Sequence, residues 1–374
     1  MTPTKPTRFS LFAACPPGLE PILEDELKGL GWSQARAEPG GVALTGAWHD
    51  IWRLNLMSRC ASRVLVRVAI FRAQHLSELE EKTGEADWRE IIAPGTRIQV
   101  EAVCKRSKIY HSGAAEERVQ KALQRLGAEP GAQGTKIFVR IENNKVEISA
   151  DSSGDLLHKR GYKEDVVKAP LRETMAAAFL RFCDYRPGES LIDPMCGSGT
   201  IPIEAAAISA GLLPGAARAF AFESFPSFER AVFEGVKERA AAKTATAPAD
   251  IIAGWDRQER AISAASANAE RAGLAGHIRF AVGKVSELAR PEGAPGLVLV
   301  NPPYGERLGA KADLGSLYAA FGQVMRERFA GWRVGLITAD GKLAQATRLP
   351  FKASTPPIPH GAVRVICSVT DPLG

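Results

Sequence analysis

Short apolar runs alternate with stretches of helical spacing throughout the second half of the chain. The runs are nearly free of charged residues, and each is too short to form a helix. Runs of this kind, alternating with helices, are typical of the buried strands of a mostly parallel, doubly wound α/β sheet. The expected strands lie at 190–193, 251–255, 278–282, 297–300 and 333–337, with a last pair at 351–354 and 363–370. The expected helices lie at about 199–210, 258–272, 313–329 and 340–347.

The first 160 residues follow a different pattern, in which strands and amphipathic helices succeed one another as in an α+β fold. We expect strands at 9–14 and 42–44 and helices at 20–30 and 48–57, which together make a small unit over residues 1–60. Further along, the pattern predicts strands at 61–70 and 97–104, helices at 75–85 and 113–126, and a hairpin of 136–142 with 145–151. A domain boundary is expected near residue 160.

The strand at 190–193 ends in a carboxylate, Asp193, and leads through a glycine turn into a helix. Gly197 and Gly199 allow a ligand to approach the backbone because glycine has no Cβ, and Thr200 begins the helix. A dinucleotide site would require a third glycine, and Asp193 would repel its phosphates. A carboxylate here suits a cofactor with a cationic end, such as the ammonium and sulfonium of S-adenosylmethionine. An ordinary strand-to-helix turn is the alternative on these residues alone.

A second strand end carries the sequence Asn301-Pro302-Pro303-Tyr304. Two prolines directly after a strand cannot continue a hydrogen-bonded ladder, and they fix an extended backbone. The Asn301 amide, the Pro302 carbonyl and the Tyr304 ring would then offer two acceptors and an aromatic face. This set matches a planar substrate with an exocyclic amino group. A rigid proline turn with a packed tyrosine is the structural alternative.

These two motifs, DPMCGSGT at 193–200 and NPPYGERLG at 301–309, resemble those of class I S-adenosylmethionine-dependent methyltransferases that modify amino groups. The resemblance runs through the whole chain and extends to the THUMP-domain guanine-N2 methyltransferases of bacterial large-subunit ribosomal RNA. It implies a ferredoxin-like unit at 1–60, a THUMP RNA-binding domain at 61–158 and a Rossmann-like methyltransferase domain at 159–374. The last strand pair resembles the antiparallel edge of that domain.

The resemblance also implies roles for the residues at the strand ends. Asp256 would accept hydrogen bonds from the cofactor ribose, and the backbone of Val285 would contact the adenine. Asn301 and the Pro302 carbonyl would hold the amino group of the target base, and Tyr304 would stack on that base. The expected catalytic residues are therefore Asn301, Pro302 and Tyr304. The expected cofactor residues are Asp193, Pro194, Cys196, Gly197, Gly199, Thr200, Asp256, Val285 and Asn301.

Two features depart from the common form of this methyltransferase fold. An insertion at 211–250 separates the glycine turn from Asp256, and it is rich in phenylalanine. Many relatives have an aspartate after the third strand that accepts a hydrogen bond from the adenine amino group, whereas this chain has Lys284. A lysine cannot accept that bond, so either the Val285 backbone contacts the adenine or the affinity for the cofactor is lower.

Basic residues of the first half are the candidates for contacts with RNA phosphates. They are Lys105, Arg106, Lys108 and Arg118, and the junction between the two halves adds Arg160 and Tyr162. A solvated surface charge is an equally good interpretation of each basic residue. The formal net charge of +6 is divided equally between the residues before and after residue 160. RNA binding therefore depends on local clustering of charge.

Hydropathy and cysteine usage limit the ligands and the compartment. No apolar stretch approaches a membrane span, and residues 1–10 lack the apolar core of a signal peptide. The six cysteines are scattered and form no C-x-x-C or Cys/His cluster, so we expect neither a disulfide nor a metal site. We expect a cytoplasmic monomer whose partner is 23S ribosomal RNA or a large-subunit assembly intermediate.

Other functions stay open on the sequence alone. Enzymes that methylate DNA adenine, tRNA guanine or a glutamine amide use a similar proline loop, but the first 160 residues argue against DNA and protein substrates. A tRNA guanine-N2 methyltransferase is the main alternative, and a non-catalytic RNA-binding assembly factor is another. The longest members of the family carry a second methyltransferase domain, so we expect this chain to perform only the first of their two reactions.

Overall fold

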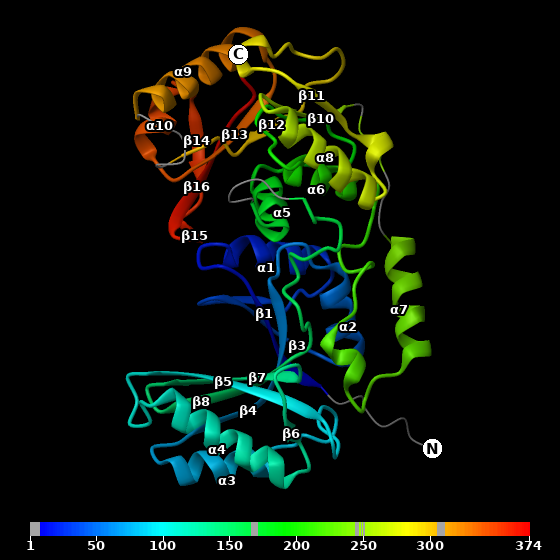
Figure 1. Ribbon diagram of the computed structural model, residues 1–374, viewed down its shortest axis with the longest axis vertical. Helices are drawn as coiled ribbons and strands as arrows, with labels where there is room; N and C mark the ends of the chain where they lie inside the picture. The colour runs from blue at the N-terminus through cyan, green and yellow to red at the C-terminus, as the bar shows by residue number, and fades with distance from the viewer. Residues whose placement is uncertain (1–7, 166–170, 244–246, 248, 250, 305–310) are drawn as a thin grey trace. The chain divides into compact units, whose positions relative to one another are not determined.

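The computed structural model describes residues 8–165, 171–243, 247, 249, 251–304 and 311–374 (Figure 1). The chain forms two compact units. The N-terminal unit contains Met1–Cys15, Glu24–Leu157 and Arg218–Ala240, and the C-terminal unit contains Pro16–Leu23, His158–Ala217 and Ala241–Gly374. The chain therefore passes between the units more often than a simple boundary near residue 160 would require.

The N-terminal unit is built on one eight-stranded sheet with the order β2-β3-β1-β4-β8-β7-β5-β6. Strand β4 pairs with β1 on one side and with β8 on the other, so the expected units at 1–60 and 61–158 share a continuous sheet. The strands are β1 (Phe9–Ala14), β2 (Arg36–Glu38), β3 (Gly41–Gly46), β4 (Arg63–Arg72), β5 (Arg97–Lys105), β6 (Glu129–Pro130), β7 (Thr135–Glu142) and β8 (Lys145–Asp151). The helices α2 (Trp48–Met57), α3 (Leu76–Glu85) and α4 (Ser112–Arg125) belong to this unit, whereas α1 (Glu20–Gly29) is divided between the two units after Leu23.

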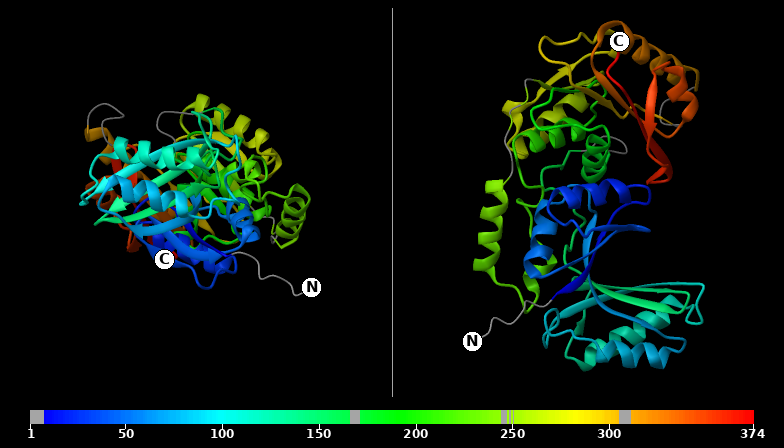
Figure 2. Two further views of the ribbon diagram at one scale, coloured as in Figure 1. Left: turned by 90° about the horizontal axis from the view of Figure 1, so that it is seen from below. Right: turned by 180° about the vertical axis from the view of Figure 1, so that it is seen from behind.

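Helices α3 and α4 lie together against one face of this sheet beside β5, as both figures of the ribbon show (Figure 1, Figure 2). Strand β7 accordingly alternates fully buried residues with more accessible ones, which is the period of a strand covered on one face. The predicted hairpin of β7 and β8 is present. It turns at Asn143 and Asn144, whose φ angles of 52° and 61° suit the tight turn of a two-residue hairpin.

The C-terminal unit is a doubly wound sheet with the order β11-β10-β9-β12-β13-β16-β14, in which β9 to β13 are parallel and the last two strands antiparallel. The strands are β9 (Leu191–Asp193), β10 (Ile252–Asp256), β11 (Arg279–Val282), β12 (Leu297–Val300), β13 (Arg333–Thr338), β14 (Phe351–Ser354), β15 (Ile358–His360) and β16 (Val363–Thr370). The helices are α5 (Glu173–Phe182), α6 (Thr200–Ser209), α8 (Glu259–Arg271), α9 (Lys311–Arg328) and α10 (Gly341–Ala346). The predicted strands and helices of this unit, including the antiparallel edge, are confirmed, whereas β15 was not predicted.

Both faces of the C-terminal sheet are covered, which explains why its strands read as continuous apolar runs. All four residues of β12 are buried. Val298 and Val300 pack in a core that includes Tyr318, Phe321 and other residues of α9. Helices on both faces leave the two ends of the strands as the places where polar side chains can gather.

Residues Arg218–Ala240 of the phenylalanine-rich insertion belong to the N-terminal unit. Phe222 stacks on Phe220 at a ring distance of 5.0 Å and lies edge-on to Phe233 at 5.1 Å. Phe222 and Phe233 also pack against Trp52 of α2. The insertion also contains a helix that was not predicted, α7 (Arg230–Lys243). The expected domain at 159–374 therefore includes a segment whose hydrophobic partners lie in the first half of the sequence.

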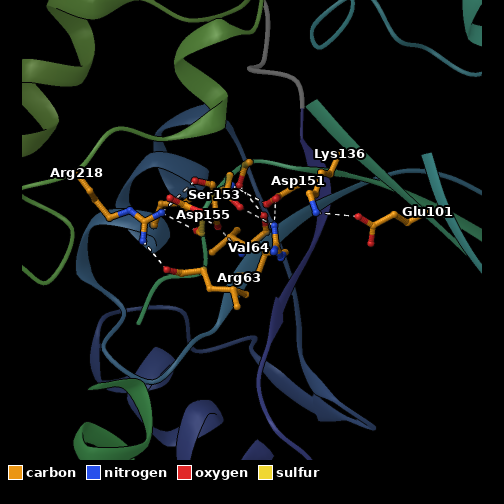
Figure 3. A network of polar contacts seen from close by, with 12 residues as sticks. Arg63, Val64, Glu101, Lys136, Asp151, Ser153, Asp155 and Arg218 are labelled. Carbon is orange, nitrogen blue, oxygen red and sulfur yellow. Dashed lines mark hydrogen bonds and ion pairs between the residues drawn. The ribbon is translucent and has the colours of Figure 1, made fainter. Parts of the chain in front are cut away.

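Arg218 anchors the beginning of this segment (Figure 3). Its guanidinium donates to the carbonyl oxygens of Asp155 at 2.6 Å and Leu156 at 2.8 Å. Arg63 reaches the same stretch of chain, where it pairs with the buried Asp151 carboxylate and donates to the Gly154 carbonyl at 2.8 Å. Two arginines thus fix the residues that lead out of β8.

The aromatic cluster yields a prediction about stability. Phe222→Ala should lower the free energy of unfolding of the N-terminal unit by about 3–5 kcal/mol, because the ring is fully buried and its removal leaves a cavity. Urea unfolding followed by tryptophan fluorescence measures this change. Leu126→Ala, at a site that is 39% exposed, is the control and should change stability by no more than about 0.5 kcal/mol. Similar small effects for both variants would show that the insertion does not support the unit.

Candidate active site

Two polar residues of the two motifs and a third, Asp256, meet at one edge of the C-terminal sheet. Strand β9 pairs in parallel with β10 on one side and β12 on the other, and Asp193 and Asp256 end β9 and β10 while Asn301 directly follows β12. The strand order reverses between β9 and β12. In open α/β sheets this switch point, outside the carboxyl ends of the strands, is where ligands bind.

The turn after β9 depends on its glycines. Gly197 and Gly199 have φ angles of 55° and 83°, in the left-handed region that side chains disfavour. A Cβ on Gly199 would lie 3.0 Å from the Cβ of Ala265 in α8. The Cys196 amide donates to the Trp255 carbonyl at 2.8 Å, which ties the turn to β10. The backbone path of the turn is therefore fixed by its neighbours.

Asp256 lies directly beside this turn. Its Oδ2 accepts a hydrogen bond from the Gly197 amide at 3.1 Å, and its Oδ1 accepts one from the Gln258 amide at 2.9 Å. Each carboxylate oxygen can accept a second hydrogen bond, so the group retains the capacity to bind two hydroxyl groups of a ligand. This is the geometry that the expected ribose contact requires.

Asp193 is almost fully buried, at 2% exposure, and accepts a hydrogen bond from the Met195 amide at 3.1 Å. Burial raises the pKa of its carboxyl group well above the usual range, the Met195 bond opposes this, and the nearby Asp256 raises it further. Burial and the same two carboxylates also raise the pKa of the Cys196 thiol. A ligand with positive charge would relieve the repulsion between Asp193 and Asp256, so the site fits a cationic cofactor.

The Asn301 side chain presents a hydrogen-bond acceptor that no described residue uses. Its Oδ1 is buried, and among the described residues it has no hydrogen-bond partner. Pro302 is buried next to it. The Pro303 carbonyl accepts a hydrogen bond from the Tyr318 hydroxyl at 3.3 Å, which connects the proline loop to α9. The bond to Tyr318 ties Pro303 to α9, and the Asn301 oxygen stays a candidate acceptor for a ligand.

Tyr304 differs from the expectation. Its side chain is only 2% exposed, so no ring face is open for a base to stack on. The sequence could not show this, since a tyrosine after a proline turn can point to either side. Gly305 and the rest of the NPPYGERLG motif lie outside the described residues.

The residues at the expected adenine position lie after β11. Val285 begins a short 3-10 helix and its side chain is buried in the core, while the Lys284 side chain is exposed. The Lys284 amide donates to Glu287 at 3.3 Å. Lys284 therefore contributes no acceptor to the site, and Val285 is placed to contribute through its backbone only.

Arg160 and Tyr162 do not fit the expected role in RNA binding. They are 6% and 8% exposed, and both lie within 3.5 Å of Glu204 Oε1 on helix α6. Their polar groups contact Glu204 inside the C-terminal unit and are not accessible to RNA, so the prediction of RNA contacts is wrong for these two residues. The contact could not be seen in the sequence, because Arg160 and Glu204 are 44 residues apart.

The other RNA candidates lie in the N-terminal unit. Lys105, Arg106 and Lys108 are exposed, in a loop held by a hydrogen bond of 2.8 Å from the Lys108 amide to Asn144. Tyr110 follows them and is 81% exposed. Arg118 instead forms an ion pair with the buried Glu80 at 2.9 Å, so its guanidinium is partly engaged within the unit.

A groove that sequence analysis missed lies beside this loop. Its volume is about 420 Å³, and it is formed at the tip of the β7–β8 hairpin. Its lining contains four cationic and three anionic side chains, namely Arg67, Arg72, Arg140, Lys145, Glu38, Glu142 and Glu147. The basic members are spread over β4, β7 and β8, which is why no cluster is visible in the sequence.

Two further classes of site are not found in the described part of the chain. None of its helices combines the length and the hydrophobicity needed to cross a membrane. Among the described residues, no three histidine, cysteine, aspartate or glutamate side chains come together as metal ligands would.

Comparison with known proteins agrees with this architecture. The family described as "RMKL-like, methyltransferase domain" matches residues 160–355, and "RlmL ferredoxin-like domain" matches residues 10–65. The chain is 36% identical over 359 residues to "Ribosomal RNA large subunit methyltransferase K/L" of Syntrophotalea carbinolica, covering 91% of this chain and 50% of that protein. It thus spans about half the length of the first curated relatives it matches.

Two other proteins match over nearly their full length. One is "Putative RNA methyltransferase slr0064" of Synechocystis, which is 31% identical over 92% of both chains. The other is the solved structure of "SMU.472, a putative methyltransferase complexed with SAH", which is 27% identical with a TM-score of 0.89 and covers 99% of this chain and 100% of that chain.

The doubly wound sheet with a glycine turn and carboxylates at its switch point defines a methyltransferase of the Rossmann-like class. Within that class, the chain belongs to the family of RMKL-like methyltransferase domains, here preceded by an RlmL-type ferredoxin-like domain.

The geometry of Asp256 predicts its effect on ligand binding. Asp256→Ala should weaken the binding of S-adenosylhomocysteine by about 1.5–3 kcal/mol, because it removes a charged acceptor placed beside the glycine turn. Isothermal titration calorimetry measures the affinity. Asp340→Ala, which removes a helix cap elsewhere in the same unit, is the control and should leave the affinity unchanged. An unaltered affinity in Asp256→Ala would refute the assignment.

Proposed function

We propose that this chain is an S-adenosylmethionine-dependent methyltransferase that acts on the exocyclic N2 amine of a guanine in 23S ribosomal RNA. The observation that carries the proposal is the buried Asn301 Oδ1, which has no partner among the described residues and follows the strand next to β9. A buried acceptor without a partner is costly, so its presence at a switch point indicates a ligand that donates a hydrogen bond.

The cofactor assignment rests on the charge and the shape of the turn after β9. Asp193 and Asp256 supply negative charge, and Gly197 and Gly199 leave the backbone accessible. Asp193, Pro194, Cys196, Gly197, Gly199 and Thr200 would hold the methionine end, Asp256 the ribose and the Val285 backbone the adenine. The related protein SMU.472 was solved with SAH, the product that such a cofactor leaves behind. When bound, S-adenosylmethionine supplies an electrophilic methyl group on its sulfonium.

The protein's own contribution to the chemistry is the orientation of the amine. The lone pair of an aromatic amine is delocalised into the ring, which makes the nitrogen a weak nucleophile. Asn301 Oδ1 and the Pro302 carbonyl would accept the two N–H groups and leave the lone pair facing the cofactor. Holding this geometry supplies much of the rate enhancement without a strong general base. Because Tyr304 is buried, its ring would support the proline loop.

The N-terminal unit would bind the RNA. Lys105, Arg106 and Lys108 form an exposed basic loop. The neighbouring groove adds Arg72, whereas its Arg67 and Arg140 form ion pairs with Glu38 and Glu142. Basic side chains placed along a surface recognise phosphates, while an exposed ring such as Tyr110 can stack on an unpaired base. This arrangement fits the THUMP-type RNA-binding domain that the sequence resembles.

Ribosomal RNA is the substrate that the relatives favour. The proteins named as large-subunit methyltransferases are 34–37% identical to this chain over about nine tenths of its length. A full-length relative is named as an RNA methyltransferase without a stated substrate, so tRNA is the alternative to be tested. An enzyme that modifies ribosomal RNA in bacteria would work in the cytoplasm, and we propose that it acts as a monomer without a metal.

The proposed role of Asn301 predicts a separation of binding and turnover. Asn301→Ala should leave the affinity for S-adenosylhomocysteine nearly unchanged and lower kcat by about 100-fold, because the acceptor acts on the amine in the transition state. Calorimetry and single-turnover methylation of 23S RNA measure the two quantities. Loss of thermal stability together with cofactor affinity would instead assign Asn301 to the structure of the proline turn.

Two substitutions at Tyr304 provide a matched comparison for the same loop. Tyr304→Phe keeps the buried ring and should retain methylation, whereas Tyr304→Ala should lower it together with the melting temperature, since the side chain is 2% exposed. Full activity in Tyr304→Ala would show that the ring has no part in forming the site.

The basic loop predicts a change in the salt dependence of RNA binding. Arg106→Gln combined with Lys108→Gln should reduce the slope of log K against log salt by about 2, or about one per lost phosphate contact. Fluorescence anisotropy with a 23S RNA fragment at several salt concentrations measures the slope. Arg89→Gln, with a side chain that is 88% exposed in the same unit, is the control and should not change it. An unaltered slope in the double variant would place the RNA elsewhere.

A further inference from the structure

A cluster of buried charged and polar residues lies next to the glycine turn, and the site described above does not include it. Its members come from the segment that leads into the C-terminal unit, from α5 and from α6, and they are Arg160, Tyr162, Lys163, Glu173 and Glu204. The two carboxylates are 1–2% exposed. Buried charges are costly unless paired, so each ought to have a partner or a function.

Lys163 connects this cluster to the glycine turn. Its Nζ donates to the hydroxyl of Thr200, the residue after Gly199, at 2.8 Å, and to the Leu171 carbonyl at 2.7 Å. The same Nζ lies 3.6 Å from Glu173 Oε1. Two hydrogen bonds and one ion pair thus hold the ammonium group, and the lysine fixes the beginning of α5 against the beginning of α6.

One carboxylate oxygen of Glu173 has no partner among the residues that the structure describes. Glu173 is the first residue of α5 and 2% exposed, and Oε1 is the oxygen that faces Lys163. Its Oε2 is buried and has no hydrogen-bond partner among the described residues. Burial raises the pKa of the group, and Lys163 opposes this. Lys163 thus cannot satisfy the carboxylate alone.

We propose that Glu173 binds the ammonium group of the cofactor's methionine end through Oε2, with Lys163 as its positioning residue. The proposal rests on the cofactor assignment above. The link through Lys163 and Thr200 places Glu173 beside the turn that would hold the methionine end. The ammonium has three N–H donors, so it can use Glu173 together with the acceptors of that turn. Lys163 and Glu173 lie outside the two sequence motifs, so the sequence alone does not indicate a role for them.

A pair of ligands that differ only in the ammonium group tests the role of Glu173. S-adenosylhomocysteine carries the ammonium, whereas its desamino analogue keeps the carboxylate and lacks that group. The wild-type chain should bind S-adenosylhomocysteine more tightly than the desamino analogue. In Glu173→Gln, most of this difference in affinity should disappear. A charged hydrogen bond of about 1.5–3 kcal/mol corresponds to a loss of about 10- to 150-fold for S-adenosylhomocysteine. The affinity for the desamino analogue should stay the same.

Calorimetry of both ligands on the full chain separates the outcomes. If Glu173→Gln lowers the affinity for both ligands equally, or lowers neither affinity, the proposed role of Glu173 is overturned and its carboxyl group is structural. Failure of the wild-type chain to bind either ligand would overturn the cofactor assignment as well. Glu189→Gln, which removes a carboxylate paired with Arg333 in the same unit, is the control variant and should leave both affinities unchanged.

Variants of Lys163 test the positioning role and do not require Glu173 to be altered. Lys163→Met should lower the affinity for S-adenosylhomocysteine more than that for the desamino analogue, because it releases the carboxylate from its orientation. Lys163→Arg keeps a charged donor and should restore most of the difference between the ligands. A uniform loss of both ligands in Lys163→Met without rescue by Lys163→Arg would show that the lysine only supports the fold.

Discussion

The parallel pairing of β9 with both β10 and β12 is the constraint on which the site depends. Backbone hydrogen bonds fix the register of these strands, with Ile192 aligned with Ala253 on one side and with Val298 on the other. The three strand ends must therefore meet at one edge of the sheet. Asp193, Asp256 and Asn301 come together because of this register, although 108 residues of sequence separate the first from the last.

The buried polar groups at this edge explain the chemistry of the site. Two neighbouring carboxyl groups favour a cation, because Asp256 raises the pKa of Asp193 and the burial of Asp193 raises it as well, so that a positive charge would oppose both effects. The Asn301 oxygen favours a hydrogen-bond donor, because it is buried and has no partner among the described residues. The cationic methyl donor and the amine of the proposed reaction match these two preferences.

The sequence predicted the C-terminal sheet and its strand-end residues well, because buried parallel strands form continuous apolar runs that end in informative residues. It failed where the outcome depends on contacts between distant segments. The burial of Arg160, Tyr162 and Tyr304 depends on such contacts, as does the packing of Phe222 against Trp52. The continuous sheet of the N-terminal unit was missed for a related reason, since β4 carries no sequence feature that shows it pairs on both edges.

The central claim is that the strand-edge site methylates a guanine amine of ribosomal RNA. The most direct measurement is mass mapping of modified nucleosides after the purified chain acts on unmodified 23S RNA, with tRNA in a parallel reaction. The account predicts N2-methylguanosine at a defined position of 23S RNA and no modification of tRNA. N2-methylguanosine in tRNA only, or a methylated adenine, would contradict it.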